Sequence, residues 1–380
     1  MDRAVIFKGK YQYDAVNIFA EEFGAGCEML GLGVSYIDMR RSPEEIANAH
    51  ERAYGSPCKF SFSFNAARGS FMADGRSIYE MHPWPFITAL VDHPYHHLEH
   101  LPLRNAIVTC MDRSHLRFLK RLRPELRTAF LPHGGSVCCE KFPFGKRDIP
   151  LFFPGTFSDP AEYWQIIKTL RDDILPFAAS AAEALLSSDT MPVEDALEPL
   201  ALKAGVELFG DSGQAGKLRV ILPLLDLFIR AQRRLSFLFA LDKAGLAVDI
   251  CGNKWPEGLF KNHRIHGPKN YRDTLEIMGR SQLVLSLSLF PDGSHERVFS
   301  GMLCGAAVLS DGNPYYREFF KDGEEIILYQ TDDFAPLPGR IASLLSDKEK
   351  LADIAAKGEA SASLHHSWAA RARQVLELVS

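Results

Sequence analysis

Residues 283–311 read LVLSLSLFPDGSHERVFSGMLCGAAVLSD. An apolar run typical of a buried strand ends in a polar turn. A segment rich in small residues follows, and a second apolar run begins at Ala306. This order predicts a strand at 283–289, a helix from His295 and a strand at 307–309, as in a parallel sheet.

The polar turn between the two apolar runs has the composition of an anion site. A helix that begins at about His295 leaves several backbone N–H groups pointing at one spot, which favours phosphate. Gly293 allows close backbone approach, Ser294 adds a hydroxyl, and His295 and Arg297 add positive charge. The alternative is a capped helix with Ser294 as N-cap and Arg297 in solvent. The stretch alone does not decide between the two.

Short apolar runs alternate with helical patterns through the first third of the chain. Strands are predicted at 4–7, 34–37, 58–64, 86–91, 106–110 and 128–131, and helices at 13–30, 43–53 and 113–122. This alternation predicts an α/β fold with a parallel sheet. Ligands of such sheets gather at the carboxyl ends of strands. Asp92, His93 and His133 follow predicted strands and are therefore candidate site residues.

A second α/β unit is predicted from a strand at 149–153, which leads into a turn at Gly155 and Thr156. Helices at 161–175 and 217–243 follow, and the alternation resumes with a strand at 248–251 and a helix from Tyr271. The residues at about 159–243 are therefore interpreted as a helical insertion. Its long helix has an apolar stripe with Arg230, Arg233 and Arg234 largely opposite. We expect it to recognise an acceptor or partner, with a packing element as the alternative.

The bulk composition describes an ordinary globular protein. Of 380 residues 46% are hydrophobic and 24% charged, and the net charge of −5 argues against a nucleic-acid partner. Seven scattered cysteines without a C-x-x-C pattern predict a reducing, cytoplasmic location. The first apolar run is too short for a signal peptide, and no window approaches the roughly 18 apolar residues of a membrane span. Contact with a membrane surface stays open.

Three common phosphate or metal signatures do not fit the sequence. Residues 210–217, GDSGQAGK, misplace the first glycine of a P-loop, and Leu218 stands where Ser or Thr must hold magnesium. The glycines at 24, 26, 31 and 33 match neither the spacing nor the strand-to-helix position of a dinucleotide fingerprint. There is also no Asp-x-Asp pair.

The segment DHPYHHLEH at residues 92–100 is rich in histidine. His96 and His100 have i,i+4 spacing, with which a helix could hold a metal on one face. Nothing supplies the glutamate of an H-E-x-x-H motif, however. The other interpretations are surface or core-edge histidines, or a role of Asp92 or His93 in the site.

Several blocks occur in the order and spacing of one family. In the second half these are ICGNKWPE, GPKNYRDTLEIMGRSQLVLSLS, GSHERVFSGMLCGAAVLSD, YYREFFKDGEEIILYQ and HHSWAARARQVLEL. In the first half and at the junction they are DHPYHHLEHL, VTCMDRSHLRFLKRL, FLPHGG and RDIPLFFPGTFSD. Together they resemble GT-B glycosyltransferases, specifically the spore-maturation (CgeB-like) group. The resemblance covers nearly the whole chain apart from the helical insertion.

The resemblance implies two Rossmann-like domains that face a cleft. We expect an acceptor domain at 1–145, a nucleotide-sugar domain at 146–365, and a closing helix at 366–380 that crosses back to the first domain. The family needs no resident cofactor, and we expect no metal. The donor co-substrate would be a UDP-, GDP- or dTDP-linked sugar, and the acceptor a glycan, a protein or a small molecule.

The resemblance also implies site residues. Those expected at the donor are Gly155, Thr156, Gly252, Asn253, Lys254, Tyr271, Gly293, Ser294, His295, Glu296, Arg297 and Ser300. Many GT-B enzymes have an acidic residue at the position of Ser300, where it holds the ribose hydroxyls. A serine bonds ribose more weakly than a carboxylate does. The stereochemistry that accompanies the usual acidic pair is therefore in doubt for this chain.

These features predict a metal-independent glycosyltransferase. Fixed N–H groups, His295, Arg297 and Lys254 would stabilise the leaving pyrophosphate. Asp92, His93 and His133 are the candidates for the group that accepts the proton of the acceptor. The alternative is a non-catalytic nucleotide- or glycan-binding protein that keeps the fold, which the serine at position 300 favours. A metal-dependent hydrolase built on the histidine segment is a third hypothesis.

Overall fold

The computed structural model describes residues 2–65, 72–73, 76–77, 82–101, 105–170 and 173–380. By their contacts these residues divide into two compact units. The first unit comprises Met1–Ser136, Ser294–Phe299 and Ala362–Ser380, and the second comprises Val137–Gly293 and Ser300–Ser361. Along its length the chain therefore changes from one unit to the other four times.

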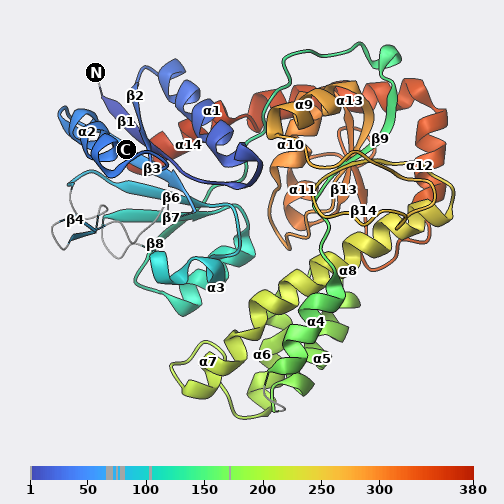
Figure 1. The fold of residues 1–380 in the computed structure, drawn as a ribbon, viewed down its shortest axis with the longest axis horizontal. Coiled ribbons are helices and arrows are strands. Elements are labelled where there is room, and N and C mark those ends of the chain that lie inside the picture. Colours follow the sequence, from blue (N-terminus) through green and yellow to red (C-terminus); the bar gives the residue numbers. More distant parts are fainter. Residues whose placement is uncertain (1, 66–71, 74–75, 78–81, 102–104, 171–172) are drawn as a thin grey trace. The chain divides into compact units, whose positions relative to one another are not determined.

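The first unit contains, in its described part, a six-stranded parallel sheet in the order β2-β1-β3-β6-β7-β8 (Figure 1). Its strands are β1 (Arg3–Lys8), β2 (Gly33–Asp38), β3 (Phe60–Phe64), β6 (Phe86–Leu90), β7 (Ala106–Cys110) and β8 (Arg127–Phe130). The short strands β4 (Met72–Ala73) and β5 (Arg76–Ser77) form a separate antiparallel pair. Every residue of β3, β6 and β7 is buried, as expected for inner strands of a parallel sheet.

The α-helices that lie wholly within the first unit are α1 (Ala15–Met29), α2 (Pro43–Tyr54), α3 (Arg113–Leu122) and α14 (Trp368–Val379). All of them except α1 begin with a side-chain cap. A capping box of Ser42 and Glu45 starts α2, and the carboxylate of Asp112 caps α3. α14 packs against α1, where a Cβ added to Gly26 would lie 2.6 Å from the Cα of Ala369. A glycine is needed there for the two helices to approach so closely.

The second unit contains another six-stranded parallel sheet among the described residues, in the order β11-β10-β9-β12-β13-β14. Its strands are β9 (Ile149–Pro154), β10 (Asp249–Cys251), β11 (Arg264–Ile265), β12 (Ser281–Leu285), β13 (Ala307–Asp311) and β14 (Ile327–Tyr329). The accompanying helices are α9 (Tyr271–Arg280), α10 (Glu296–Leu303), α11 (Pro314–Phe319), α12 (Leu337–Ser346) and α13 (Lys348–His365). The first turn of α10 is assigned to the first unit.

Between β9 and β10 the described residues form five helices, which are grouped in a bundle (Figure 1). They are α4 (Pro160–Thr169), α5 (Leu175–Leu186), α6 (Val193–Lys203), α7 (Gly213–Arg219) and α8 (Ile221–Lys243). The end of α8 joins the core of the second sheet through Phe237, Leu238 and Leu241. In the parts of the chain that are described, no helix has the length and apolarity to cross a membrane.

Both α/β units and the helical insertion are confirmed, but two helices of the insertion were predicted wrongly. The helix expected at 161–175 ends at Thr169, residues 171–172 lie outside the described ranges, and Pro176 occupies the first turn of α5. Proline is favoured in that position because it needs no N–H partner there. The helix expected at 217–243 is two helices. Pro223 cannot donate to the carbonyl of Arg219, which is where α7 ends.

The arginines of α8 also lie differently from the prediction. They were expected opposite the apolar stripe, free to recognise an acceptor or a partner. Instead Arg233 is buried, and Arg230 and Arg234 are partly buried. Each donates a hydrogen bond to a backbone carbonyl of the second unit. The recognition role predicted for these three side chains therefore loses its structural basis.

Candidate functional site

The candidate donor residues of the second unit lie at the carboxyl edge of its sheet. Gly155 follows β9 and Gly252 follows β10, and the two loops touch through their backbones. The N–H of Gly155 donates to the carbonyl of Cys251 (2.8 Å), and a Cβ added to Gly252 would lie 1.9 Å from the carbonyl oxygen of Gly155. Only a residue without a side chain fits at position 252.

Further bonds fix this pair of loops. The carbonyl of Gly155 accepts a hydrogen bond from the indole Nε1 of Trp255 (2.7 Å), and that of Asn253 accepts one from the N–H of Phe157 (2.9 Å). Lys254 has a left-handed backbone, with φ of 63°, which few residues other than glycine adopt. Its N–H donates to the side chain of Asn253 (2.9 Å). This held conformation points to a functional constraint on the loop.

The loop at residues 286–293, which follows β12, is strained and firmly held. Leu289 has φ of 56°, an unfavourable value for a large side chain. The buried carboxylate of Asp311 accepts hydrogen bonds from the N–H groups of Ser288 and Leu289, both at 2.8 Å. The amide Nδ2 of Asn313 donates to the carbonyls of Phe290 (2.9 Å) and Gly293 (3.0 Å). The predicted strand at 283–289 therefore ends at Leu285, because these N–H groups bond to side chains.

Tyr271 and Ser300 are brought together within the second unit. Their hydroxyl oxygens are 2.9 Å apart, and both residues are buried. Tyr271 was expected to flank the nucleotide base and Ser300 to stand in the position of a ribose-binding acid. In the structure each hydroxyl serves as a partner of the other. Ribose contact by Ser300 would have to compete with this bond.

The residues at the start of α10 belong to the first unit, where they meet the carboxyl edge of its sheet. The N–H of Ser294 donates to the carbonyl of Met111, which follows β7 (3.2 Å). Its hydroxyl accepts a hydrogen bond from the N–H of His133, which follows β8 (2.9 Å). Ser294 is fully buried. Its N–H and its hydroxyl therefore have protein partners.

The amino end of α10 already holds a negative charge. The carboxylate of Glu296 contacts the imidazole of His295 and the N–H of Arg297. Burial alone would raise the pKa of Glu296, but the positive charge and hydrogen bond of His295, together with the charge of Arg297, bring it down to about 2. A carboxylate is favoured at a helix amino end for the reason that phosphate is. A phosphate bound here would have to displace Glu296 or share these donors with it.

His133 is the candidate with the most distinctive environment. Its side chain is buried, and its Nδ1 atom has no hydrogen-bond partner among the described residues. Burial lowers the pKa of His133 to about 3, and the charge of the nearby His295 adds to this effect. The centroids of these two imidazoles are 5.9 Å apart. The low pKa favours the neutral imidazole of His133, and its Nδ1 is a buried nitrogen without a hydrogen-bond partner among the described residues.

Residues 366–371 hold the backbone of His133 in place. The guanidinium Nε of Arg371 donates to the carbonyl of His133 (2.8 Å), and its Nη2 contacts Nδ1 of His366 (3.0 Å). The indole of Trp368 packs against Phe19, with ring centroids 4.9 Å apart. α14 thus belongs to the same unit as His133 and holds the backbone of the loop after β8.

The other two predicted catalytic residues follow β6. Asp92 is exposed, and one of its carboxylate oxygens accepts a hydrogen bond from Nδ2 of Asn65 (2.7 Å). His93 is buried, its ring stacks on Tyr95 at 3.7 Å, and its Nδ1 accepts a hydrogen bond from the N–H of Tyr95 (3.3 Å). His93 thus has the contacts of a structural residue, whereas the carboxylate of Asp92 is accessible.

The metal interpretation of the histidine segment does not survive. His96 and His100 lie in two separate 3-10 helices, Pro94–His96 and Leu98–His100, so the i,i+4 argument for a shared helical face fails. Across the described ranges no group of three or more His, Cys, Asp or Glu side chains is arranged to hold a metal ion. Within that part of the chain the hydrolase hypothesis has no metal site.

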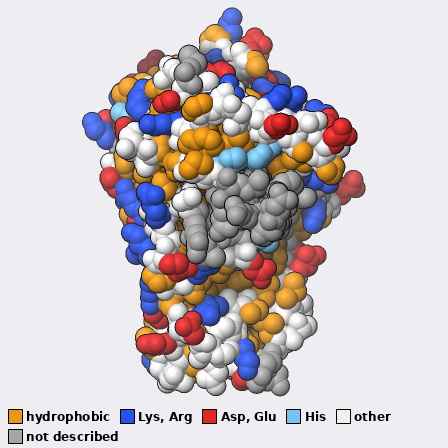
Figure 2. Space-filling view, turned by 90° about the vertical axis from the view of Figure 1, so that its left-hand side faces the viewer, with side chains coloured by type: hydrophobic (Ala, Val, Ile, Leu, Met, Phe, Trp, Pro, Cys, Tyr) orange, Lys and Arg blue, Asp and Glu red, His pale blue; other side chains and the backbone are white. Residues whose placement is uncertain are grey.

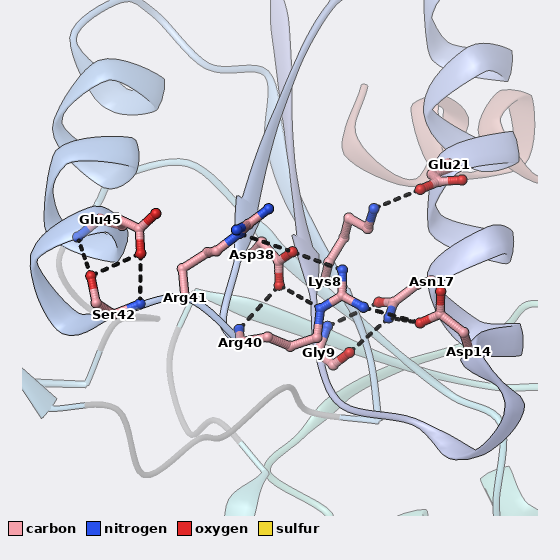
Figure 3. Close-up of polar contacts among 10 residues, drawn as sticks. All are labelled: Lys8, Gly9, Asp14, Asn17, Glu21, Asp38, Arg40, Arg41, Ser42 and Glu45. Carbon is pink, nitrogen blue, oxygen red and sulfur yellow. Dashed lines mark hydrogen bonds and ion pairs between the residues drawn. The ribbon is translucent and has the colours of Figure 1, made fainter.

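The sequence did not reveal a polar network at the carboxyl ends of β1 and β2 (Figure 3). Asn17 is fully buried, accepts a hydrogen bond from the N–H of Gly9 (3.0 Å) and donates to the carbonyl of Gly9 (2.7 Å). Arg40 bonds to Asp38 and to Asp14. Tyr13 and Asp14 both have left-handed backbones, with φ of 58° and 57°. Consecutive residues of this kind mark a loop under strain, a frequent property of functional sites.

A second cluster lies at the opposite, amino edge of the same sheet. The rings of Tyr54 and His82 stack at 3.7 Å, and the Nε2 atoms of His50 and His82 are 3.2 Å apart. Burial and the charge of His50 lower the pKa of His82 to about 4. Figure 2 looks onto the side of the first unit that carries α2 and shows histidines exposed beside hydrophobic side chains. This cluster is separate from the candidate site.

Comparisons with known proteins agree with this architecture. Residues 232–377 match the family described as Glycosyl transferase-like. No curated protein matches the sequence. Among solved structures, the sucrose-phosphate synthase of Thermosynechococcus elongatus is similar at 12% identity and a TM-score of 0.53, over 100% of this chain and 98% of that one.

Two further structures are similar over their whole length. HepE of Anabaena shares 12% identity with a TM-score of 0.53, over 100% of this chain and 99% of that one. An alpha-glucosyltransferase shares 11% identity with a TM-score of 0.59, over 99% of both chains. The chain therefore has the GT-B fold, as predicted. The narrower resemblance to the spore-maturation group stays a prediction.

Proposed function

Since the chain has the GT-B fold and is glycosyltransferase-like over residues 232–377, we propose that it transfers a sugar from a nucleotide sugar to an acceptor hydroxyl or other nucleophile. One observation carries this proposal. The matched residues 232–377 contain the loops after β10 and β12, with Gly252 and Gly293. In these loops Lys254 and Leu289 have left-handed backbones, and the loop backbones are held by hydrogen bonds. Such loops at the carboxyl edge of a parallel sheet are the usual ligand site of this architecture.

For the donor we propose a UDP-, GDP- or dTDP-linked sugar bound at the carboxyl edge of the second sheet. The residues of the second unit proposed to contact it are Gly155, Thr156, Gly252, Asn253, Lys254, Tyr271, Gly293 and Ser300. The contacts expected of Ser294, His295, Glu296 and Arg297, at the start of α10, stay predictions. HepE was solved with UDP and glucose, and the alpha-glucosyltransferase with UDP-glucose. UDP is therefore the first nucleotide to test.

The chemistry needs charge stabilisation more than covalent help. The bond between the anomeric carbon and the phosphate oxygen breaks, and the nucleoside diphosphate leaves with additional negative charge. We propose that Lys254 stabilises that charge without a divalent metal, and the same role for His295 and Arg297 at the start of α10 stays a prediction. The carboxylate of Glu296 occupies the helix end in the structure, so its displacement by pyrophosphate is part of that prediction.

We propose His133 as the group that accepts the proton of the acceptor. The imidazole is neutral, which a base requires, and its Nδ1 has no partner within the described part of the chain. A pKa of about 3 makes a weak base, but the carboxylate of Asp92 raises the pKa of His133 and would stabilise the imidazolium that forms. Asp92, whose carboxylate is accessible, is the second candidate.

The acceptor is proposed to be a glycan, a protein or a small molecule. The alpha-glucosyltransferase structure contains DNA, but the net charge of −5 of the present chain argues against a nucleic-acid acceptor. A cytoplasmic location is also proposed. None of the seven cysteines, all of which are described, forms a disulfide bond in the structure, in keeping with a reducing compartment.

Titration calorimetry with UDP, GDP and dTDP tests the donor proposal. We expect one nucleotide to bind with unchanged affinity in the presence of EDTA, and the matching labelled nucleotide sugar to be hydrolysed slowly without acceptor. Binding that disappears with EDTA would contradict metal independence. If none of the three nucleotides binds and none of their sugars is turned over, the function itself is wrong.

The hydrogen bond between Tyr271 and Ser300 favours a second candidate, a nucleotide- or glycan-binding protein without turnover. A serine in place of the ribose-binding acid, already bonded to a tyrosine, weakens the ribose contact. Such a protein would bind a nucleotide in calorimetry but would neither hydrolyse nor transfer the labelled sugar. The same pair of assays therefore separates the two functions.

A further inference from the structure

Helix α8 places two arginines one helical turn apart on the same side. Residues four apart on a helix lie one above the other. Arg230 and Arg234 each donate through Nη1 to a backbone carbonyl outside the helix, at 2.7 Å in both cases. The acceptors are Ser288, in the loop after β12, and Thr156, in the loop after β9. The strands β9 and β12 are neighbours in the second sheet.

The side chain of Arg230 is oriented by its contacts with Asp226, Phe290 and Ser288. Its Nε bonds to both carboxylate oxygens of Asp226, at 2.9 and 2.8 Å. Its guanidinium lies over the ring of Phe290, 4.8 Å from the centroid. Because these contacts fix the orientation of the planar guanidinium, its hydrogen bond holds the carbonyl of Ser288 in one position.

The loop that Arg230 contacts needs such support. Leu289 has a left-handed backbone, and Ser288 and Leu289 direct their N–H groups to Asp311. Asp311 thus holds the N–H side of the loop, and Arg230 holds the carbonyl of Ser288. A strained backbone persists only where its surroundings over-determine it. The loop ends at Gly293, where the proposed pyrophosphate site begins.

Arg233, between the two, ties the helix to its own bundle. Its guanidinium donates to the carbonyls of Leu185 (2.6 Å) and Ser188 at the end of α5. α8 therefore links the inserted helices to the two loops at the carboxyl edge of the second sheet.

We propose that Arg230 and Arg234 are positioning residues for the donor, which set the loops that carry Thr156 and Ser288 in the conformation that binds a nucleoside diphosphate. This inference rests on the proposed function, because it assumes that the donor occupies that edge. It also assigns the inserted helices a role as a support for the donor site. Neither arginine is expected to touch the donor itself.

The test compares Arg230→Gln, Arg234→Gln and the double variant with Arg219→Gln. Arg219 is a matched control, since it also donates to two carbonyls, of Leu208 (2.7 Å) and Gly210 (2.8 Å), but inside the insertion. Dissociation constants for UDP, GDP and dTDP are measured by calorimetry at 15 °C, and folding is followed by circular dichroism and thermal melting. We expect the double variant to weaken nucleotide binding about tenfold or more. Arg219→Gln should lower the melting temperature but change the dissociation constant less than twofold.

Lysine provides a rescue test. Arg230→Lys keeps the charge but cannot bond both Asp226 and Ser288 in the same geometry, so its affinity should lie between wild type and Arg230→Gln. If Arg230→Gln does not fold, Asp226→Asn, which loosens only the orientation of Arg230, takes its place. If the wild type binds none of the three nucleotides, the proposed function is refuted. If the wild type binds a nucleotide and the arginine variants lose no more affinity than Arg219→Gln does, only the positioning role is refuted.

Discussion

The backbone N–H of His133 donates to the hydroxyl of Ser294 at 2.9 Å, although 161 positions separate the two residues in the sequence. Through this bond the loop after β8 is attached to the amino end of α10. Ser294 also donates to Met111, so two neighbouring strand ends of the first unit hold it. The start of α10 is thus anchored to the sheet that carries His133.

Replacing His133 by glutamine should remove transfer but leave donor binding. Glutamine retains hydrogen-bonding capacity but is not a base, and loss of a general base typically costs about 10²–10⁴ in rate. The dissociation constant for UDP should change little. Transfer of labelled sugar and calorimetry are measured on the same sample, with His100→Gln, an exposed histidine, as control. Full transferase activity in the His133 variant would move the base to Asp92.

Acid should destabilise the first unit. Burial lowers the pKa of His133 to about 3 and that of His366 to about 2. In the unfolded chain each takes up a proton near pH 6.5. The unfolded state then binds more protons, so the free energy of unfolding falls as the pH drops below about 6.5. Each group contributes up to about 1.4 kcal/mol per pH unit until its folded pKa is reached.

Urea unfolding at pH 7.5, 6.5, 5.5 and 4.5 measures this effect. The midpoint should be nearly constant between the first two values and fall at the lower two. His82, with a pKa of about 4, should add to the fall between pH 6.5 and 4. A midpoint that does not change down to pH 4.5 would show that these imidazoles are not buried in the neutral form.

Gly252→Ala should separate the two loops at the carboxyl edge of the second sheet. The new methyl group would lie 1.9 Å from the carbonyl oxygen of Gly155, so the backbones must move apart. We expect nucleotide affinity to fall at least tenfold. Gly216→Ala is the matched control, because a Cβ there meets nothing within 4 Å and alanine favours α7 by about 1 kcal/mol. Equal nucleotide affinity in both variants would place the donor elsewhere.

Trp368→Ala should destabilise the first unit by about 3–5 kcal/mol, the usual cost of removing a large buried aromatic side chain. The indole is 3% exposed and packs on Phe19 and Phe64. Trp368→Phe should cost much less, because it keeps a ring and removes a buried N–H that has no partner in the described chain. Chemical unfolding gives both values. Similar losses for the two variants would mean that the indole N–H contributes more than the packing.

Periodicity predicted most of the sheet and helix framework. Strands such as β7 and helices such as α3 were predicted to the residue, because buried parallel strands are continuous apolar runs and Asp112 is a plain N-cap. The insertion was predicted less well. The helix predicted at 161–175 ends just before Pro176, but proline also favours a helix start, and the helix predicted at 217–243 runs through Pro223, which the prediction did not treat as a break.

The site was less predictable than the framework, since its bonds join distant segments. Nothing in the local sequence pairs His133 with Ser294 or Tyr271 with Ser300. The arginine side of α8 was misinterpreted for a related reason. A cationic stripe on an amphipathic helix looks the same whether it meets water or the carbonyls of a folded loop. The left-handed backbones of Tyr13 and Asp14 could not be predicted from the sequence, because neither residue is the glycine that usually marks such a position.

The order of the chain within the two units has a consequence for biosynthesis. The first unit lacks α14 until residues 362–380, the last 19 of the sequence, have left the ribosome, whereas the second unit ends at Ser361. Until then Phe19, Phe64 and Gly26 expose the apolar surface that Trp368 and Ala369 later cover. Domains usually fold in the order of synthesis. Here the half that is translated first is the half that is completed last, so a nascent chain stalled before residue 362 should expose an unfinished amino-terminal sheet to chaperones.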